Sequence, residues 1–120
     1  MTSVWPSVTY PAHTTMVTGV SPARHGVVNN LPFDPFEDNQ GGWYWYASDV
    51  RVPTLWDAAA REGVSVLNVS WPVTVGAPIR YNVPQIWRAK NDEDEKLLCA
   101  LATSGICALL RANGAVVPLD

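Results

Sequence analysis

The sequence predicts an α/β fold, and two junctions between helix-like and strand-like segments carry that prediction. An alanine-rich stretch at 54–63 leads, after one glycine, into the strand-favouring run 64–70. An extended N-terminal segment leads into another helical stretch at 11–19. This alternation is typical of α/β units. With 120 residues, 48% of them hydrophobic and 16% charged, the chain has the composition and size of one globular domain.

The first expected elements are an extended segment over residues 1–10 and a helix from Pro11 to Gly19. Pro6 and Pro11 disfavour an earlier helix, because proline pushes the residue before it into an extended conformation. Pro11 suits a first helical turn, and Gly19 suits the position that follows a helix. Thr9 is therefore expected just outside the N-terminus of this helix.

Residues 20–53 are expected to form a long loop, because proline, asparagine and paired glycines recur through them. A loop of this length is usually functional or disordered. Its aromatic side chains argue against disorder; they are Phe33, Phe36, Trp43, Tyr44, Trp45 and Tyr46. Three acids of the loop, Asp34, Asp38 and Asp49, show no metal-ligand pattern and are interpreted as solvated.

The next helix is expected to begin after Thr54. Thr54 is a good N-cap, and Asp57 three residues later completes a pattern that resembles a capping box. Alanines favour the helix, and Gly63 ends it. The strand at 64–70 follows and is broken by the Trp-Pro pair at 71–72.

Prolines predict an irregular stretch over residues 73–89, and the acidic run 92–95 predicts the start of a helix. The pair Ser104-Gly105 is expected to interrupt that helix. Cys99 and Cys107 lie eight residues apart on the same helical stretch. A separation of about two helical turns is too long for a disulfide, so both are predicted to be buried free thiols.

Charge and hydropathy exclude two classes of function. The net charge is −3 and the basic residues are scattered singly, which argues against binding to a nucleic-acid backbone. No apolar run approaches the ~20 residues of a membrane span. Residues 1–6 lack the basic and apolar regions of a signal peptide, which favours a cytoplasmic chain if the natural N-terminus is present.

Thr9 is the first candidate for chemistry. A hydroxyl next to a helix N-terminus lies where unpaired N–H groups and the helix dipole attract an anion such as phosphate. A metal ion would lower the pKa of such a hydroxyl and make it a nucleophile. The alternative is that Thr9 is an ordinary cap or strand residue.

The surrounding pattern resembles the nucleotide pyrophosphatase/phosphodiesterase family of the alkaline phosphatase superfamily. That family's nucleophile region runs Thr-Phe-Pro-Asn-His, Val-Thr-Gly, Pro-x-x-His-Gly and then Asn. The same order and spacing occur here as Thr9-Tyr10-Pro11-Ala12-His13, Val17-Thr18-Gly19, Pro22-Ala23-Arg24-His25-Gly26 and Asn30. The likeness is strong at 7–30 and continues more loosely through the α/β unit and its Trp71-Pro72 pair.

The resemblance implies a fold and a division of the chain. The fold would be a fragment of an alkaline-phosphatase-like three-layer sandwich with a mostly parallel sheet. Residues 1–120 would then be a partial phosphodiesterase catalytic domain. Its parts would be the nucleophile segment 7–30, the aromatic loop 31–52, the α/β unit 53–72, and an irregular stretch with C-terminal helices at 73–120.

The resemblance also implies roles for single residues. Thr9 matches the nucleophile, which attacks phosphorus and bridges two zinc ions. Asn30 matches a donor to a phosphoryl oxygen. Tyr10 matches an aromatic position that stacks on a nucleobase or leaving group, with plain packing as the open alternative. His13 and His25 are interpreted as structural rather than as metal ligands.

The sequence departs from the family at the metal site. Ala12 replaces a common Asn, which bears on specificity. The family's Asp and His ligands match nothing in this chain, so Thr9 is the single matched metal ligand. Because a zinc site needs at least three protein ligands, we expect the isolated chain to bind zinc poorly and to turn over slowly or not at all.

Three hypotheses follow for function. The first is a truncated phosphoric ester hydrolase that acts on a small phosphorylated substrate, such as a nucleotide, through a phospho-threonine intermediate. The second is a non-catalytic remnant that binds a phosphorylated ligand or a protein partner. The third is an α/β domain without a site. The compartment stays open, because members of the family are often exported.

Overall fold

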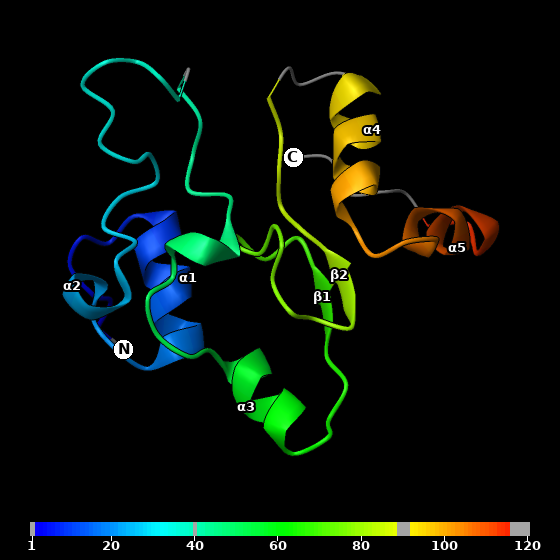
Figure 1. The fold of residues 1–120 in the computed structure, drawn as a ribbon, viewed down its shortest axis with the longest axis horizontal. Coiled ribbons are helices and arrows are strands. Elements are labelled where there is room, and N and C mark those ends of the chain that lie inside the picture. Colours follow the sequence, from blue (N-terminus) through cyan, green and yellow to red (C-terminus); the bar gives the residue numbers. More distant parts are fainter. Residues whose placement is uncertain (1, 40, 89–91, 116–120) are drawn as a thin grey trace.

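The computed structural model describes residues 2–39, 41–88 and 92–115. In it the chain folds around a two-stranded parallel sheet that has helices on both sides (Figure 1). In chain order the elements are α1 (Thr9–Thr18), α2 (Pro22–His25), the 3₁₀ helix η1 (Ala47–Asp49), α3 (Leu55–Arg61), β1 (Leu67–Val69), β2 (Tyr81–Val83), α4 (Asp92–Leu101) and α5 (Ile106–Ala112).

The sheet pairs β1 with β2 in parallel, with Asn68 opposite Asn82 in the central register position. Helices α4 and α5 both contact β2, whereas α1 packs with α2 on the other side of the sheet (Figure 1). The α/β class and the parallel pairing are therefore confirmed.

Helix α1 begins at Thr9, two residues earlier than the sequence predicts. Val8 is the N-cap residue, with φ −91° and ψ 165°, and its carbonyl accepts from the Ala12 N–H at 3.2 Å. Pro11 fits inside this first turn because the N–H groups there have no helical acceptor to lose. The helix ends as expected, since Gly19 has φ 71° and donates its N–H to the Thr15 carbonyl.

The prediction of a continuous loop at 20–53 is wrong at three places. The chain forms α2 at Pro22–His25 and η1 at Ala47–Asp49, and Tyr46 makes a parallel bridge to Val75. Long-range bonds hold these pieces, such as Arg51 N–H to the His25 carbonyl at 3.0 Å. Such contacts lie outside the reach of local sequence patterns.

Helix α3 begins as its N-terminal pattern predicts. The Thr54 side chain accepts from the Asp57 N–H, and an Asp57 carboxylate oxygen accepts from the Thr54 N–H at 2.7 Å. The following strand is shorter than expected, since β1 covers three residues, Leu67–Val69. Ser70 has φ 56°, a conformation that ends the strand before Trp71.

The stretch 73–89, expected to be irregular, contains β2. A buried polar network explains why this short strand forms. The Asn68 Nδ2 donates to Asn82 Oδ1 at 2.7 Å and to Thr74 Oγ1 at 3.1 Å, and Asn82 Nδ2 donates to the Thr74 carbonyl at 2.7 Å. All three side chains are at most 7% exposed, so these bonds replace the water they lose.

The prediction of free thiols is wrong, because Cys99 and Cys107 form a disulfide. The predicted interruption at Ser104-Gly105 is the reason. Gly105 has φ 80°, so α4 and α5 are separate helices and the two cysteine Cα atoms lie 5.8 Å apart. A single continuous helix would have kept them about 12 Å apart along its axis.

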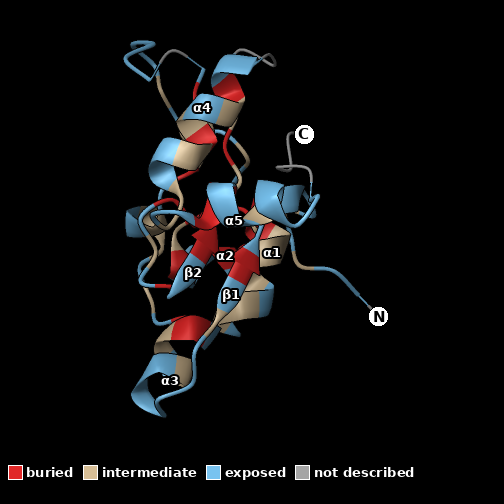
Figure 2. Ribbon diagram, turned by 90° about the vertical axis from the view of Figure 1, so that its right-hand side faces the viewer, coloured by how far each residue is buried: buried red, intermediate tan, exposed pale blue. Residues whose placement is uncertain are grey.

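The core joins the sheet to the N-terminal helix through buried apolar side chains (Figure 2). They are Tyr10, Val27, Trp45, Val73, Val75, Val83, Ile86, Leu98, Ile106 and Cys107. One face of β1 remains open to solvent, since Leu67 is 64% and Val69 is 51% exposed.

Candidate active site

Thr9 is the first residue of α1, so its hydroxyl lies at the N-terminus of a ten-residue helix. The Val8 cap makes no side-chain bond to the helix, and Thr9 is exposed. Helix N-terminal N–H groups attract anions, and a phosphate placed there would lie beside the Thr9 hydroxyl. Pro11 has no N–H and the Tyr10 N–H is bonded to Asn30, so few N–H donors of this first turn remain for an anion.

Asn30 lies at the same end of α1, although twenty residues of chain separate it from Tyr10. Its side-chain oxygen accepts the Tyr10 N–H at 2.8 Å. Because that oxygen is the acceptor, the amide NH₂ of Asn30 is the group left to donate. The Asn30 carbonyl accepts the Tyr44 N–H at 2.9 Å, which ties this residue to the aromatic loop as well.

The Tyr10 side chain is buried in the core. It is 1% exposed, and its ring meets Trp43 edge to face at a centroid distance of 5.4 Å. Trp43 in turn meets Trp87 at 5.2 Å. Of the two interpretations of Tyr10, this burial favours packing, since a ring that stacks on a substrate must be reachable.

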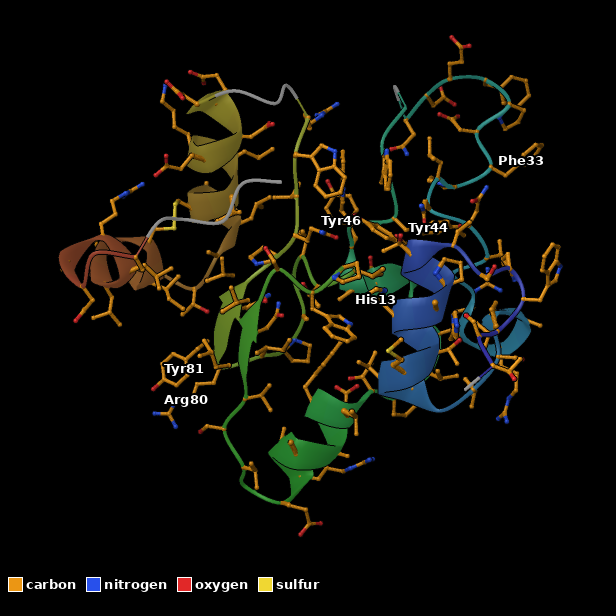
Figure 3. The ribbon with its side chains drawn as sticks, turned by 180° about the vertical axis from the view of Figure 1, so that it is seen from behind. His13, Phe33, Tyr44, Tyr46, Arg80 and Tyr81 are labelled. Carbon is orange, nitrogen blue, oxygen red and sulfur yellow. A yellow bond between two sulfur atoms is a disulfide. The ribbon has the colours of Figure 1, made fainter. Side chains whose placement is uncertain are left out.

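His13 contacts the candidate nucleophile and a distant part of the chain. Its Nδ1 lies 2.8 Å from the Thr9 carbonyl oxygen, and its ring meets the Trp71 ring edge to face at 4.9 Å. Figure 3 shows His13 on the side of α1 that faces the sheet. In the sequence, Trp71 breaks the strand and belongs to the looser part of the family pattern, and no local signal links it to Thr9.

His25 is fully buried and joins α1 to α2. Its Nδ1 accepts the Val27 N–H at 3.2 Å, so its Nε2 carries the proton and donates to Thr15 Oγ1 at 3.0 Å. Burial lowers the pKa of His25, and the Pro11 backbone carbonyl, which accepts a hydrogen bond from the ring, partly opposes this. These contacts agree with a structural role.

A zinc site does not fit the residues that the structure describes. Among them, no group of three or more His, Cys, Asp or Glu side chains lies close enough to hold a metal ion. A single hydroxyl such as that of Thr9 cannot hold zinc, which prefers at least three protein ligands, mainly imidazole, thiolate and carboxylate. The described residues therefore supply no zinc-dependent chemical step.

Two cavities of the described surface have neither Thr9 nor Asn30 in their walls. One of about 380 Å³ is lined by Leu31, Pro32, Asp34, Glu37, Gly41 and Gly42. Another of about 550 Å³ lies beside α3 and includes Arg51 and Arg61 in its wall. No helix of the described residues has the length and apolar character needed to cross a membrane.

Comparison with known proteins relates this chain to a family. The profile of the type I phosphodiesterase/nucleotide pyrophosphatase family matches residues 1–107. An uncharacterised pyrophosphatase/phosphodiesterase of Schizosaccharomyces pombe is 36% identical over 78 residues, covering 57% of this chain and 15% of that protein. Human ectonucleotide pyrophosphatase/phosphodiesterase family member 1 is 27% identical over 116 residues, covering 84% of this chain and 12% of that protein.

A third relative has a higher identity over a shorter stretch. An ectonucleotide pyrophosphatase/phosphodiesterase of Caenorhabditis elegans is 55% identical over 31 residues, which cover 26% of this chain and 4% of the relative. The chain thus spans a small part of each relative's length. Because the family profile covers most of the chain, the chain belongs to the type I phosphodiesterase/nucleotide pyrophosphatase family.

Proposed function

We propose that this chain carries the nucleophile segment of a phosphoric ester hydrolase, with Thr9 as the nucleophile and Asn30 as a donor to the phosphoryl group. One observation supports it above the others. The 2.8 Å bond from the Tyr10 N–H to Asn30 Oδ1 brings Asn30 to the helix end that presents Thr9. Family membership supports phosphoester hydrolysis, and the specific roles are our own assignment.

The proposed reaction has two displacements. The Thr9 Oγ attacks phosphorus and forms a phospho-threonine as the bond from phosphorus to the leaving oxygen breaks, and the Thr9 proton ends on that leaving oxygen. The oxygen of a water molecule then bonds to phosphorus as the bond from phosphorus to Thr9 Oγ breaks, and a proton of that water returns to Thr9 Oγ. The Asn30 NH₂, together with the positive end of the helix dipole, would stabilise charge on the phosphoryl oxygens, where donors count most.

The substrate that we propose is a small phosphorylated molecule of the nucleotide class, in line with the names of the relatives. The wider domain would be the three-layer sandwich that the family resemblance implies, of which β1 and β2 would form a part. Because the described residues do not form a zinc site, the isolated chain is expected to be a slow catalyst or none.

Hydrolysis of bis(4-nitrophenyl) phosphate by the chain with added zinc tests this proposal. We expect any turnover to vanish in Thr9→Ala and to survive in Ser7→Ala, which removes an exposed hydroxyl two residues away. Asn30→Ala should lower kcat by about 10²-fold, the usual cost of one such donor. Mass spectrometry of the acid-quenched chain should find phosphate on Thr9.

Turnover that is equal in Thr9→Ala and the unaltered chain would contradict the assignment. A second candidate function is phosphate binding without turnover, which the exposed helix N-terminus with Thr9 supports. In that case inorganic phosphate would shift the NMR signals of Thr9 and Tyr10, and no product would form with any variant.

A further inference from the structure

We propose that His13 is a positioning residue for Thr9, and that Trp71 holds the His13 ring in the orientation this requires. The proposal rests on the proposed role of Thr9 as nucleophile. His13 belongs to the sequence pattern around Thr9, yet the proposed reaction assigns it no role. Its contacts with the Thr9 carbonyl and with the Trp71 ring indicate such a role.

The hydrogen bond to Thr9 fixes the protonation of the His13 ring. A carbonyl oxygen only accepts hydrogen bonds, so the Nδ1 of His13 must carry a proton to bond the Thr9 carbonyl at 2.8 Å. In neutral His13 the other nitrogen, Nε2, is then unprotonated. His25 must have the opposite arrangement, because its Nδ1 accepts the Val27 N–H.

The bond from His13 completes a clamp on one peptide group. The Thr9 carbonyl and the Tyr10 N–H belong to the same planar unit. Asn30 holds the N–H side at 2.8 Å, and His13 holds the carbonyl side at 2.8 Å. The carbonyl has two lone pairs, so it accepts from His13 in addition to the helical bond.

Fixing that plane fixes the backbone of Thr9 and so the direction of its side chain. A serine or threonine nucleophile gains rate when the reacting oxygen is already held near its attacking position. The clamp acts through the backbone and makes no contact with substrate, which is why His13 is a positioning residue rather than a catalytic one.

Trp71 is itself held by the turn that follows β1. Its backbone N–H donates to Asn68 Oδ1 at 3.1 Å, and its carbonyl accepts from Thr74 Oγ1 at 2.6 Å. Asn68 and Thr74 belong to the buried polar network of the sheet. A chain of contacts therefore connects the sheet to the N-terminus of α1. It runs from the turn after β1 to Trp71, and from there to His13, whose ring centroid lies 4.9 Å from that of Trp71.

Three substitutions of His13 distinguish the effect of its Nδ1–H donor from the effect of the volume of its ring. In His13→Asn the amide NH₂ lies near the place of Nδ1–H and can restore the bond. In His13→Gln the amide extends toward the place of Nε2, and in His13→Ala no donor remains. Amide exchange of Tyr10, whose N–H lies in the clamped plane, should be roughly fivefold to tenfold faster in the Ala and Gln variants.

The Asn variant should return Tyr10 exchange to the rate of the unaltered chain, and the melting temperature should change little in all three. Nitrogen-15 NMR of the unaltered chain above pH 8 should show His13 protonated at Nδ1 and His25 protonated at Nε2. The proposal is overturned if His13 is protonated at Nε2 instead. It is also overturned if His13→Gln restores the exchange rate of the Tyr10 amide and His13→Asn does not.

These readouts do not require turnover, so they separate this proposal from the proposed function. If Thr9 is not the nucleophile, Thr9→Ala and the unaltered chain should hydrolyse the substrate at the same rate, whichever nitrogen of His13 carries the proton. Where the unaltered chain hydrolyses bis(4-nitrophenyl) phosphate, His13→Ala should lower kcat with KM unchanged, and His13→Asn should restore kcat. A fall in kcat that Asn does not restore would also overturn the positioning role.

Discussion

His25 shows how a single buried side chain can make the whole domain sensitive to acid. Both of its ring nitrogens are occupied, with Val27 donating to Nδ1 and Nε2 donating to Thr15. A second proton on Nδ1 would meet the Val27 N–H and would place a charge in a fully buried position. The folded state therefore resists protonation of His25, and burial lowers the pKa of this ring.

Acid should therefore destabilise the folded chain. The unfolded chain takes up a proton near the ordinary histidine value of about 6.5, whereas the folded chain does not until the pH is lower. The unfolded state then binds more protons, so the free energy of unfolding should fall as pH decreases from about 7.5 to 5.5. Urea denaturation at these two pH values measures the change.

His25→Gln is the matched control, because it removes the titrating ring and leaves His13 and Asp49 in place. We expect a flatter dependence on pH in this variant, even if it is less stable throughout. An unaltered slope in His25→Gln would show that other groups cause the acid sensitivity.

At the scale of elements, the disulfide joins α4 to α5 beside β2. Cys99 lies on α4 and Cys107 on α5, and the Glu95–Arg111 ion pair links the same two helices. Both members of that ion pair are partly exposed, so it adds little. The covalent link is the stronger constraint, because it restricts the unfolded chain.

Reduction of the disulfide should lower the free energy of unfolding by about 2–3 kcal/mol, the chain-entropy value for a loop this short. Urea denaturation with and without dithiothreitol measures the difference. A double variant, Cys99→Ser with Cys107→Ser, should match the reduced chain and ignore the reductant. Equal stability of the oxidised and reduced chains would contradict this expectation.

At the scale of the whole molecule, the sheet has an unusually open face. Parallel sheets are normally covered on both faces, yet Leu67 is 64% and Val69 is 51% exposed. Residues 64–70 carry no charge, proline or glycine, and within the described residues β1 pairs only with β2. An exposed strand of this kind favours association with other strands.

A lysine at Leu67 should therefore reduce self-association without lowering the melting temperature. The charge blocks strand pairing, and the position already faces solvent. Sedimentation velocity at two protein concentrations measures the effect. Phe33→Lys is the control, because Phe33 is 92% exposed and projects from the loop away from the sheet (Figure 3). Equal loss of association in both variants would show that general charge, rather than β1, is responsible.

The sequence determined the parts of this protein that depend on neighbouring residues. It located the helix ends at Gly19 and Thr54, the interruption at Gly105, and the family pattern around Thr9. Each of these follows from local chemistry: a glycine that tolerates positive φ, a hydroxyl that caps N–H groups, or a short motif.

Only the tertiary structure decided the rest, because it depends on contacts between distant residues. The second strand forms where Asn82 meets Asn68, and its own sequence gave no periodic signal. The disulfide required two helices to fold back on each other, which residue spacing alone could not show. The link from Trp71 through His13 to Thr9 joins positions about sixty residues apart, since packing of α1 near the sheet sets that distance.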